Sequence, residues 1–451
     1  MKNIVLAAAV ATALSSVPMG AFAASPNNDV AQIREQLEGL MKRVDKLEQE
    51  NTELKQENES LKASDEKLQA NDEYLKSEAR GLRKESAQQA VEVAKTKGTD
   101  WAGKVTVTGD MRYRYEYISD DTLSSPTGVP TADRYRDRIR ARLAVTAKAT
   151  DNLTVGIGMT TTENSDPRSG NQSLTGVFSK KAFDLDLAYF DWKFARWGNL
   201  IGGKMKQPFV KPGQSLFWDN DITPEGLALG FQSGMFFGTA YNYWLTEISG
   251  AENTRTADTM LHGAQFGVRM PMGASSLMLE AHYYDLSAAV GRAPFYNNSA
   301  NNNTVTGAAP GVLVYDYEVI SLGAEFSTMF GALPFTVWAE AAENQDPSDE
   351  NRAWGAGFLF GKASNNKTWE AGVAYQKVEK DALFAQLIDS DFAGGFSDNE
   401  GFVFRGAYTP VKNWTLNATY FLNKRNAEVA NGALQTDVDY DRLQLDFNVK
   451  F

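Results

Sequence analysis

The sequence "RYRDRIRARLAV", residues 134–145, places an arginine at every second position. The five arginines are Arg134, Arg136, Arg138, Arg140 and Arg142. On a helix, which turns by about 100° per residue, these charges would be spread around the whole cylinder. In a strand they share one face, and apolar residues such as Leu143 occupy the other. The stretch predicts a strand, although a soluble sheet with a solvated arginine face has the same pattern.

The first residues are typical of a secretory signal peptide. Residues 1–23 contain an early lysine, an apolar run and the triplet Ala21-Phe22-Ala23, which predicts cleavage before Ala24. No later run has the roughly 18 apolar residues of a membrane-spanning helix. The chain has no cysteine, so we expect neither disulfides nor a lipid-attachment site. A membrane location would therefore require strands.

Residues 30–89 show a heptad repeat. Isoleucine or leucine occupies every d position from Ile33 to Leu82. Opposite charges at neighbouring g and e positions, such as Arg43 and Glu48, favour a parallel, in-register bundle. We predict a coiled coil of about 90 Å, at about 1.5 Å per residue. The number of helices is left open, and a solvated, partly helical linker is the alternative.

The remaining residues alternate in polarity with a period of two. The predicted strands are 105–117, 134–149, 152–162, 183–194, 198–206, 226–232, 235–245, 260–270, 275–285, 313–327, 333–343, 352–361, 367–379, 400–410, 413–424 and 437–451. Short turns alternate with long links, and aromatic residues gather near the strand ends. An even number of strands joined in this way is typical of outer-membrane barrels. The last strand ends in Phe451, which resembles the signal that bacterial barrel-assembly machinery recognises.

The expected fold is an all-β transmembrane barrel of about 16 antiparallel strands, preceded by an α-helical coiled coil. The expected regions are a signal peptide at 1–23, a periplasmic coiled-coil region at 24–96 and an outer-membrane barrel at 97–451. In such a barrel the apolar side of residues 134–145 faces lipid, and the arginines face a water-filled lumen. We therefore interpret the five arginines as the basic wall of a pore.

The link "QPFVKPGQSLFWDNDITPEGL", residues 207–227, resembles the infolded constriction loop of trimeric general porins. In those proteins an acidic loop lies against a basic wall. The resemblance implies that Asp219, Asp221 and Glu225 form the acidic side. The link lacks that family's short acidic signature. As an alternative, these acids lie on an outward loop or bind a divalent ion between surface chains.

The whole chain resembles the putative-porin family of Gram-negative outer-membrane proteins with an N-terminal periplasmic coiled coil. The stretches "GGKMKQPF" (202–209) and "WDNDITPEGL" (218–227) carry this resemblance most directly. It implies a homotrimer in the outer membrane, each subunit with its own pore. We expect passive diffusion of small hydrophilic solutes and ions through a charged constriction. Two alternatives are an anion-selective porin, and a tether or adhesin that contacts the cell wall through the coiled coil.

Other function classes find little support. The net charge of −12 and the expected secretion argue against nucleic acid as a partner. The two histidines, His262 and His282, have opposite face parity in neighbouring predicted strands, so we expect no catalytic residue, metal site or cofactor. The asparagine-rich stretch at 297–304 is predicted to be a polar surface loop.

Overall fold

The computed structural model describes two separate parts of the chain. It describes residues 35, 38–39, 41–47, 49–52, 55, 59–60 and 62, and residues 102–451 except 123–132, 164–165, 248–257, 298, 309 and 429–433. The chain divides into two compact units, residues 1–98 and 99–451. The signal peptide predicted at 1–23 lies outside the described residues, as does most of the predicted coiled coil. The described residues of the first unit are helical, and none of their helices is long and apolar enough to span a membrane.

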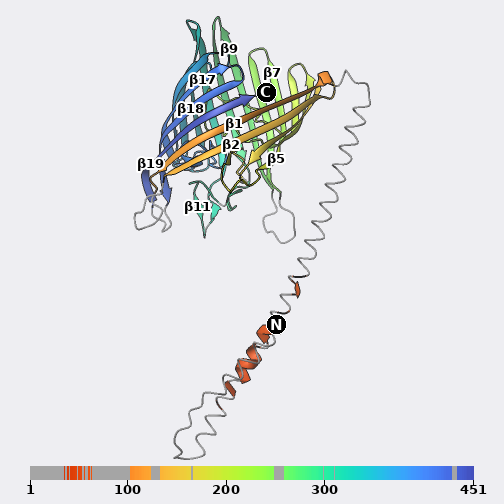
Figure 1. The fold of residues 1–451 in the computed structure, drawn as a ribbon, viewed down its shortest axis with the longest axis vertical. Helices are drawn as coiled ribbons and strands as arrows, with labels where there is room; N and C mark the ends of the chain where they lie inside the picture. The colour runs from red at the N-terminus through yellow and green to blue at the C-terminus, as the bar shows by residue number, and fades with distance from the viewer. Residues whose placement is uncertain are drawn as a thin grey trace, which may run out of the picture. The chain divides into compact units, whose positions relative to one another are not determined.

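Sixteen antiparallel strands form a closed barrel in the second unit (Figure 1). They are β1 (Val105–Asp120), β2 (Arg134–Lys148), β3 (Leu153–Thr162), β5 (Ala182–Ala195), β6 (Gly198–Lys204), β7 (Glu225–Ser233), β8 (Phe236–Thr246), β9 (Thr259–Met272), β10 (Ser275–Leu286), β13 (Tyr317–Phe330), β14 (Leu333–Asn344), β15 (Arg352–Gly361), β16 (Thr368–Val378), β17 (Asn399–Val411), β18 (Trp414–Glu428) and β19 (Leu434–Lys450). Each strand pairs with the next one along the chain, and β1 also pairs with β19. The predicted sixteen-stranded barrel is therefore confirmed.

Short elements lie in the connections between the barrel strands. They are the strands β4 (Gln172–Ser173), β11 (Val305–Thr306) and β12 (Val312–Leu313) and the 3-10 helices η1 (Ala102–Lys104) and η2 (Phe392–Gly395). Tight turns such as 234–235 and 273–274 join strands at one end of the barrel, and long loops such as 205–224 and 379–398 join them at the other. This alternation matches the sequence-based prediction.

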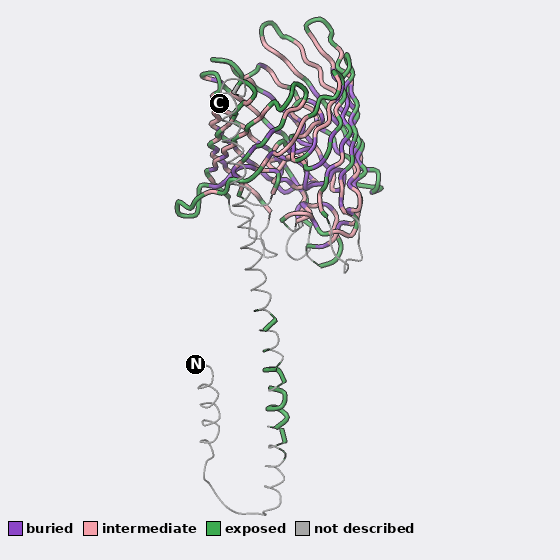
Figure 2. The backbone as a smooth tube through the Cα atoms, turned by 90° about the vertical axis from the view of Figure 1, so that its right-hand side faces the viewer, coloured by how far each residue is buried: buried purple, intermediate pink, exposed green. Residues whose placement is uncertain are grey.

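The two faces of the wall have the character expected of a membrane barrel. In β2, Arg138 and Arg140 are buried on the inner face, whereas Leu143 and Val145 are exposed on the outer face. Figure 2 shows the same alternation of exposed (green) and more buried residues along the barrel strands. A soluble sandwich would bury its apolar face instead. The outer surface of this barrel therefore suits a hydrocarbon environment.

The structure differs from the sequence-based prediction in some details, and most strand bounds shift by a few residues. The strand predicted at 313–327 is divided, because Val312–Leu313 pairs with Val305–Thr306 as β12, and β13 begins only at Tyr317. The first strand continues to Asp120, three residues beyond its predicted end. The asparagine-rich stretch is not a surface loop: Asn303 is 2% exposed, and its side chain donates to the carbonyl oxygens of Lys380 (2.8 Å) and Leu383 (3.0 Å).

The barrel closes at the seam between its first and last strands. The backbone groups of Gly109 and Phe451 exchange two hydrogen bonds of 2.9 Å. The Phe451 ring lies over Gly109, where any Cβ would collide with it. Glycine is therefore needed at position 109 to let the terminal aromatic ring pack against the sheet.

Candidate functional site: a charged constriction in the barrel

The loop at residues 205–224 folds into the barrel and reaches distant strands. The Val210 N–H donates to Gln265 Oε1 on β9 (2.8 Å), and the Gly213 N–H donates to Glu325 Oε2 on β13 (2.7 Å). At the loop tip, Gln214 Oε1 accepts a hydrogen bond of 2.6 Å from Arg405 on β17. Strands so far around the wall can be contacted together only from inside. We call residues 205–224 the first inner loop.

Aromatic side chains hold the first inner loop against the wall. Phe209 and Trp218 of the loop pack edge to face, with 5.1 Å between ring centroids, and both pack near His282. The His282 Nε2 lies 2.8 Å from the hydroxyl of Tyr241 on β8. These rings are buried, so their packing fixes the backbone on which the acidic residues of the loop stand.

The arginines of β2 meet carboxylates on the inner face. Arg140 lies 3.1 Å from Asp221 and 3.2 Å from Asp110. Arg142 shares the same two acids, at 2.8 Å from Asp110 and 3.5 Å from Asp221. Arg138 lies 3.4 Å from Glu163. The predicted basic wall is therefore largely charge-compensated.

The two remaining arginines of the row lie nearer the loop end. Arg136 pairs with Glu116, while Arg134 is exposed and has no ion pair with a carboxylate in the described part of the chain. Burial and pairing thus increase along β2 from Arg134 to Arg140. This places Arg138, Arg140 and Arg142 next to the loops that fill the lumen.

The three acids predicted for the constriction have different positions. Asp221 faces the β2 arginines. Asp219 is buried and turned away from them, where its carboxylate accepts N–H groups of Asp221 and Ser390, both at 2.8 Å. Glu225 is not in the loop: it is the first residue of β7 and pairs with Lys204 at 3.0 Å. The structure thus brings only Asp221 of the three into contact with the arginines.

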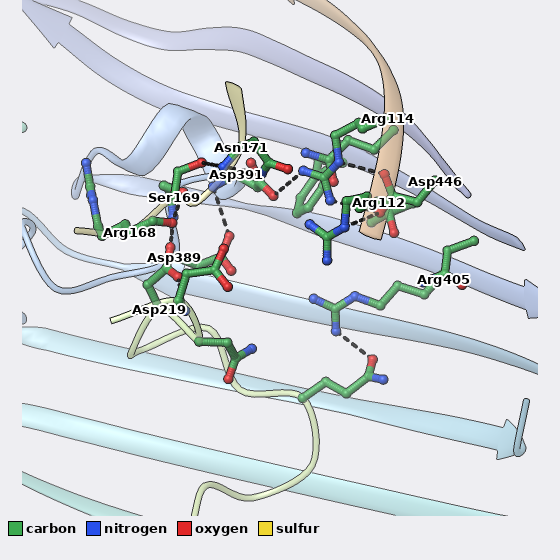
Figure 3. A pocket seen from close by; sticks show the side chains of 18 of the residues that line it. Arg112, Arg114, Arg168, Ser169, Asn171, Asp219, Asp389, Asp391, Arg405 and Asp446 are labelled. Atoms are coloured by element: carbon green, nitrogen blue, oxygen red, sulfur yellow. Dashed lines mark hydrogen bonds and ion pairs between the residues drawn. The ribbon is translucent and has the colours of Figure 1, made fainter. Parts of the chain in front are cut away.

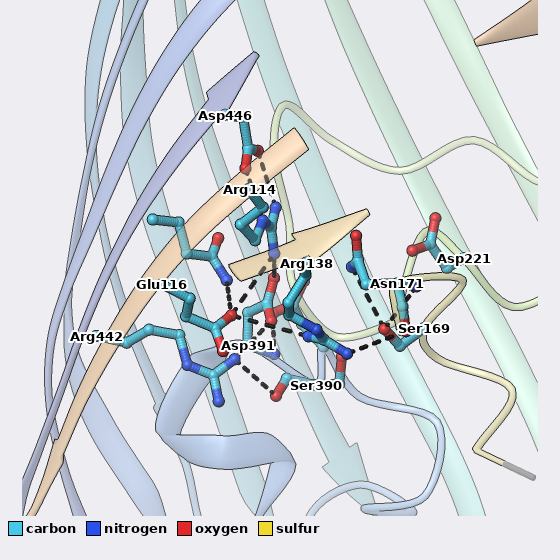
Figure 4. A network of polar contacts seen from close by, with 12 residues as sticks. Arg114, Glu116, Arg138, Ser169, Asn171, Asp221, Ser390, Asp391, Arg442 and Asp446 are labelled. Atoms are coloured by element: carbon cyan, nitrogen blue, oxygen red, sulfur yellow. Dashed lines mark hydrogen bonds and ion pairs between the residues drawn. The ribbon is translucent and has the colours of Figure 1, made fainter. Parts of the chain in front are cut away.

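A second inner loop, residues 379–398, packs against the first. Backbone hydrogen bonds join Asp219 to Leu387 (2.8 Å) and Asp389 to Leu216 (3.1 Å). Asp391 pairs with Arg114 of β1 at 3.1 Å and with Arg442 of β19 (Figure 4). The lumen therefore holds at least these two loops, rather than the single one that was predicted, and Arg168 of the link between β3 and β5 also donates to the carbonyl oxygen of Ala385 in the second inner loop (3.0 Å).

Burial and ion pairing shift the pKa values of two loop aspartates, Asp219 and Asp391, in opposite directions. Burial raises the pKa of Asp219 well above its usual range, and the neighbouring Asp389 adds to this shift. Burial alone would also raise the pKa of Asp391, but the guanidiniums of Arg114 and Arg442 outweigh it and hold the pKa well below its usual range. The surroundings therefore favour the charged form of Asp391 and disfavour the charged form of Asp219.

Several charged residues at this site were missed in the sequence-based interpretation. They are Arg112 and Arg114 of β1, Arg405 of β17, Arg442 and Asp446 of β19, and Asp389 and Asp391 of the second inner loop. The strand residues could have been found, because each alternates with outward apolar residues. The loop acids carried only a weak signal, two aspartates in the otherwise apolar "FAQLIDSDFAGG".

All of these residues except Arg442 line a cavity of about 360 Å³ (Figure 3). Arg112, Arg114 and Arg140 line one side, and Arg405 contributes from β17. A second cavity of about 360 Å³ also has Arg140 and Asp221 in its lining. The ion pair between Arg140 and Asp221 therefore lies where two cavities of the lumen adjoin.

Comparison with known proteins identifies the family. A family model described as "Putative porin" matches residues 117–313 and 312–451. The chain belongs to the putative porin family. None of the curated proteins matches it.

Several solved structures resemble this putative porin at low identity. OprB of Pseudomonas putida is 13% identical, with a TM-score of 0.49, over 78% of this chain and 95% of that one. OmpT of Vibrio cholerae is 10% identical, with a TM-score of 0.44, over 77% and 97%. A triple mutant of the Rhodopseudomonas blastica porin is 12% identical, with a TM-score of 0.40, over 77% and 100%.

Proposed function

We propose that this porin lets small hydrophilic solutes and ions diffuse through a water-filled constriction between its charged wall and its two inner loops. The observation that carries the proposal is the position of Asp221, inside a closed barrel and 3.1 Å from Arg140. A polar, charge-lined interior behind an apolar outer surface suits a channel across the outer membrane. Because the residues act by shape and charge, transport needs no catalytic residue.

The charge arrangement supports weak ion selectivity. Arginines of β1 and β2 and aspartates of the two loops line the same cavity, so cations and anions both meet favourable groups. Opposed charges orient dipolar solutes, and apolar solutes must displace ordered water without compensation. Solute size is limited by the side chains of the loops.

The organisation of the whole protein is part of the proposal. We infer a signal peptide at 1–23, a periplasmic coiled-coil region at 24–96 and a barrel that assembles as a homotrimer. Asp137 supports a subunit contact, since it lies on the outer face of β2, where its carboxylate accepts a hydrogen bond of 2.7 Å from Tyr113. A carboxylate facing lipid would be unfavourable unless protein or the interface covered it.

Single-channel recording in a planar bilayer tests the proposed function. Addition of the detergent-purified, folded protein to one chamber of potassium chloride should produce stepwise conductance increases. A salt gradient should give a small reversal potential, because both charges line the path. Folded protein that gives no more conductance than detergent alone would contradict the proposal.

The alternative of an anion ladder is testable in the same recordings. Arg138, Arg140 and Arg142 already face carboxylates, which argues against a ladder of free cations. Replacing all three by glutamine should therefore change conductance without abolishing an anion preference. Complete loss of anion preference would favour the ladder instead.

A further inference from the structure

Two arginines in the main cavity have incomplete sets of partners. Arg405 donates one hydrogen bond, to Gln214, and has no carboxylate ion pair within the described residues. Arg112 donates to Asn448 Oδ1 at 3.1 Å, and its one ion pair among the described residues is with Asp446 at 3.7 Å. A guanidinium has five N–H donors. Both side chains therefore keep terminal N–H groups for another acceptor.

The carboxylates that line this cavity are already engaged. Asp446 accepts two bonds from Arg114, at 2.6 and 2.9 Å. Asp389 accepts backbone N–H groups of Asp391 and Phe392, both at 3.0 Å. Asp221 faces Arg140, and the Asp219 carboxylate caps backbone groups, as described above. Glu370 accepts the Ala363 N–H at 3.2 Å.

The charged side chains that line the cavity are equal in number, six basic and six acidic, but the guanidiniums of Arg112 and Arg405 keep terminal N–H donors for another acceptor. Arg112 and Arg405 come from strands on either side of β18 and β19, and both point into the same space (Figure 3). Asn417 and Thr419 of β18 line the wall between them. Planar guanidiniums match the two oxygens of a carboxylate, and the neighbouring amide and hydroxyl can complete its hydrogen bonds.

We propose that Arg112 and Arg405 form a binding site for small organic carboxylates on the permeation path. This proposal rests on the proposed porin function and names a class of solute for it. A cavity of about 360 Å³ accommodates a short dicarboxylic acid. Recognition of carboxylates then originates from this pair rather than from the compensated arginines of β2.

The test is inhibition of chloride current by succinate in single-channel recordings. Succinate that binds between the two guanidiniums slows chloride passage, so the current falls as its concentration rises. In Arg112→Gln and in Arg405→Gln, the half-inhibiting concentration should rise about tenfold, which corresponds to about 1.4 kcal/mol. In Arg405→Lys the half-inhibiting concentration should rise less, because lysine keeps the positive charge.

Two control variants separate the site from other effects. Arg269→Gln removes an exposed arginine of β9 that does not line this cavity, and its inhibition curve should equal that of the unmodified protein. Gln214→Ala breaks the contact between Arg405 and the first inner loop but keeps the guanidinium. It should retain inhibition by succinate.

The outcomes distinguish this site from the porin function itself. Chloride current that succinate does not reduce, or reduces equally in all variants, would overturn the site but leave the channel intact. Loss of inhibition in Gln214→Ala as large as in Arg405→Gln would assign the effect to the loop. Equal inhibition by phosphate and succinate would overturn the preference for carboxylates. No current at all would contradict the proposed function.

Discussion

Asp221 is the residue at which the first inner loop meets the charged wall. It contacts both Arg140 and Arg142, and these two arginines also share Asp110. The face of the arginines could be predicted, since alternation in a strand decides which side of the wall each one occupies. Their compensation could not be predicted, because Glu116, Asp110 and Asp221 come from other segments. Alternation gives a residue's side of the sheet but not its partner.

Replacing Asp221 with asparagine should increase the preference for anions. The change removes one negative charge and leaves Arg140 and Arg142 with only Asp110. Partly exposed ion pairs contribute about 0.2–1 kcal/mol, so we expect about a threefold change in the chloride-to-potassium permeability ratio. Reversal potentials in a potassium chloride gradient measure it. Glu225→Gln is the matched control, since Glu225 pairs with Lys204 instead; an equal shift in both variants would contradict a special role for Asp221.

Acidification should act through Asp219. Its raised pKa means that the carboxyl takes up a proton at a higher pH than an ordinary aspartate, whose value is about 3.9. As pH falls through this raised pKa, one negative charge disappears from the cavity, and the preference for anions increases while pH is still above 3.9. In Asp219→Asn this step should be smaller but not absent, because burial also raises the pKa of Asp389 in the same cavity. Identical pH curves of reversal potential for both proteins would refute the assignment.

The two inner loops are the elements that turn a wide barrel into a narrow one. The strands that these loops connect could be predicted from the alternation of polarity. The position of the first inner loop could be predicted from its resemblance to a constriction loop. The position of the second inner loop inside the barrel could not be predicted. It depends on contacts with Asn303, Arg114 and Arg442, which are far away in sequence. The same long-range contacts bury the asparagine-rich stretch, whose composition alone indicated a solvated loop.

A methyl group at Gly213 should loosen the tip of the first inner loop. Gly213 has a φ of 53°, and a Cβ there would collide with the Trp338 ring. We expect Gly213→Ala to cost about 1 kcal/mol from backbone strain alone and more from the collision. Single-channel recordings should show larger current fluctuations.

Gly234→Ala is the matched control for this change. Gly234 has a similar φ of 58° in a tight turn, but nothing lies within 4 Å of its added Cβ. Gly234→Ala should introduce similar backbone strain but leave the single-channel current steady. Equal fluctuations in the two variants would mean that Trp338 does not hold the loop tip.

At the scale of the whole molecule, the barrel and the heptad region have separate roles in our proposal. Deletion of residues 30–89 should leave single-channel conductance within error of the full chain, because all residues of the cavity lie in the barrel. Envelope defects in cells with normal conductance would support a tethering role of the coiled coil. A change in conductance instead would contradict this separation.

The seam between Gly109 and Phe451 depends on the last of the sixteen strands. Gly109, the fifth residue of β1, bonds to Phe451, directly after β19. A product that lacked β19 would present two open ladder edges, at β1 and β18, and its barrel could not close.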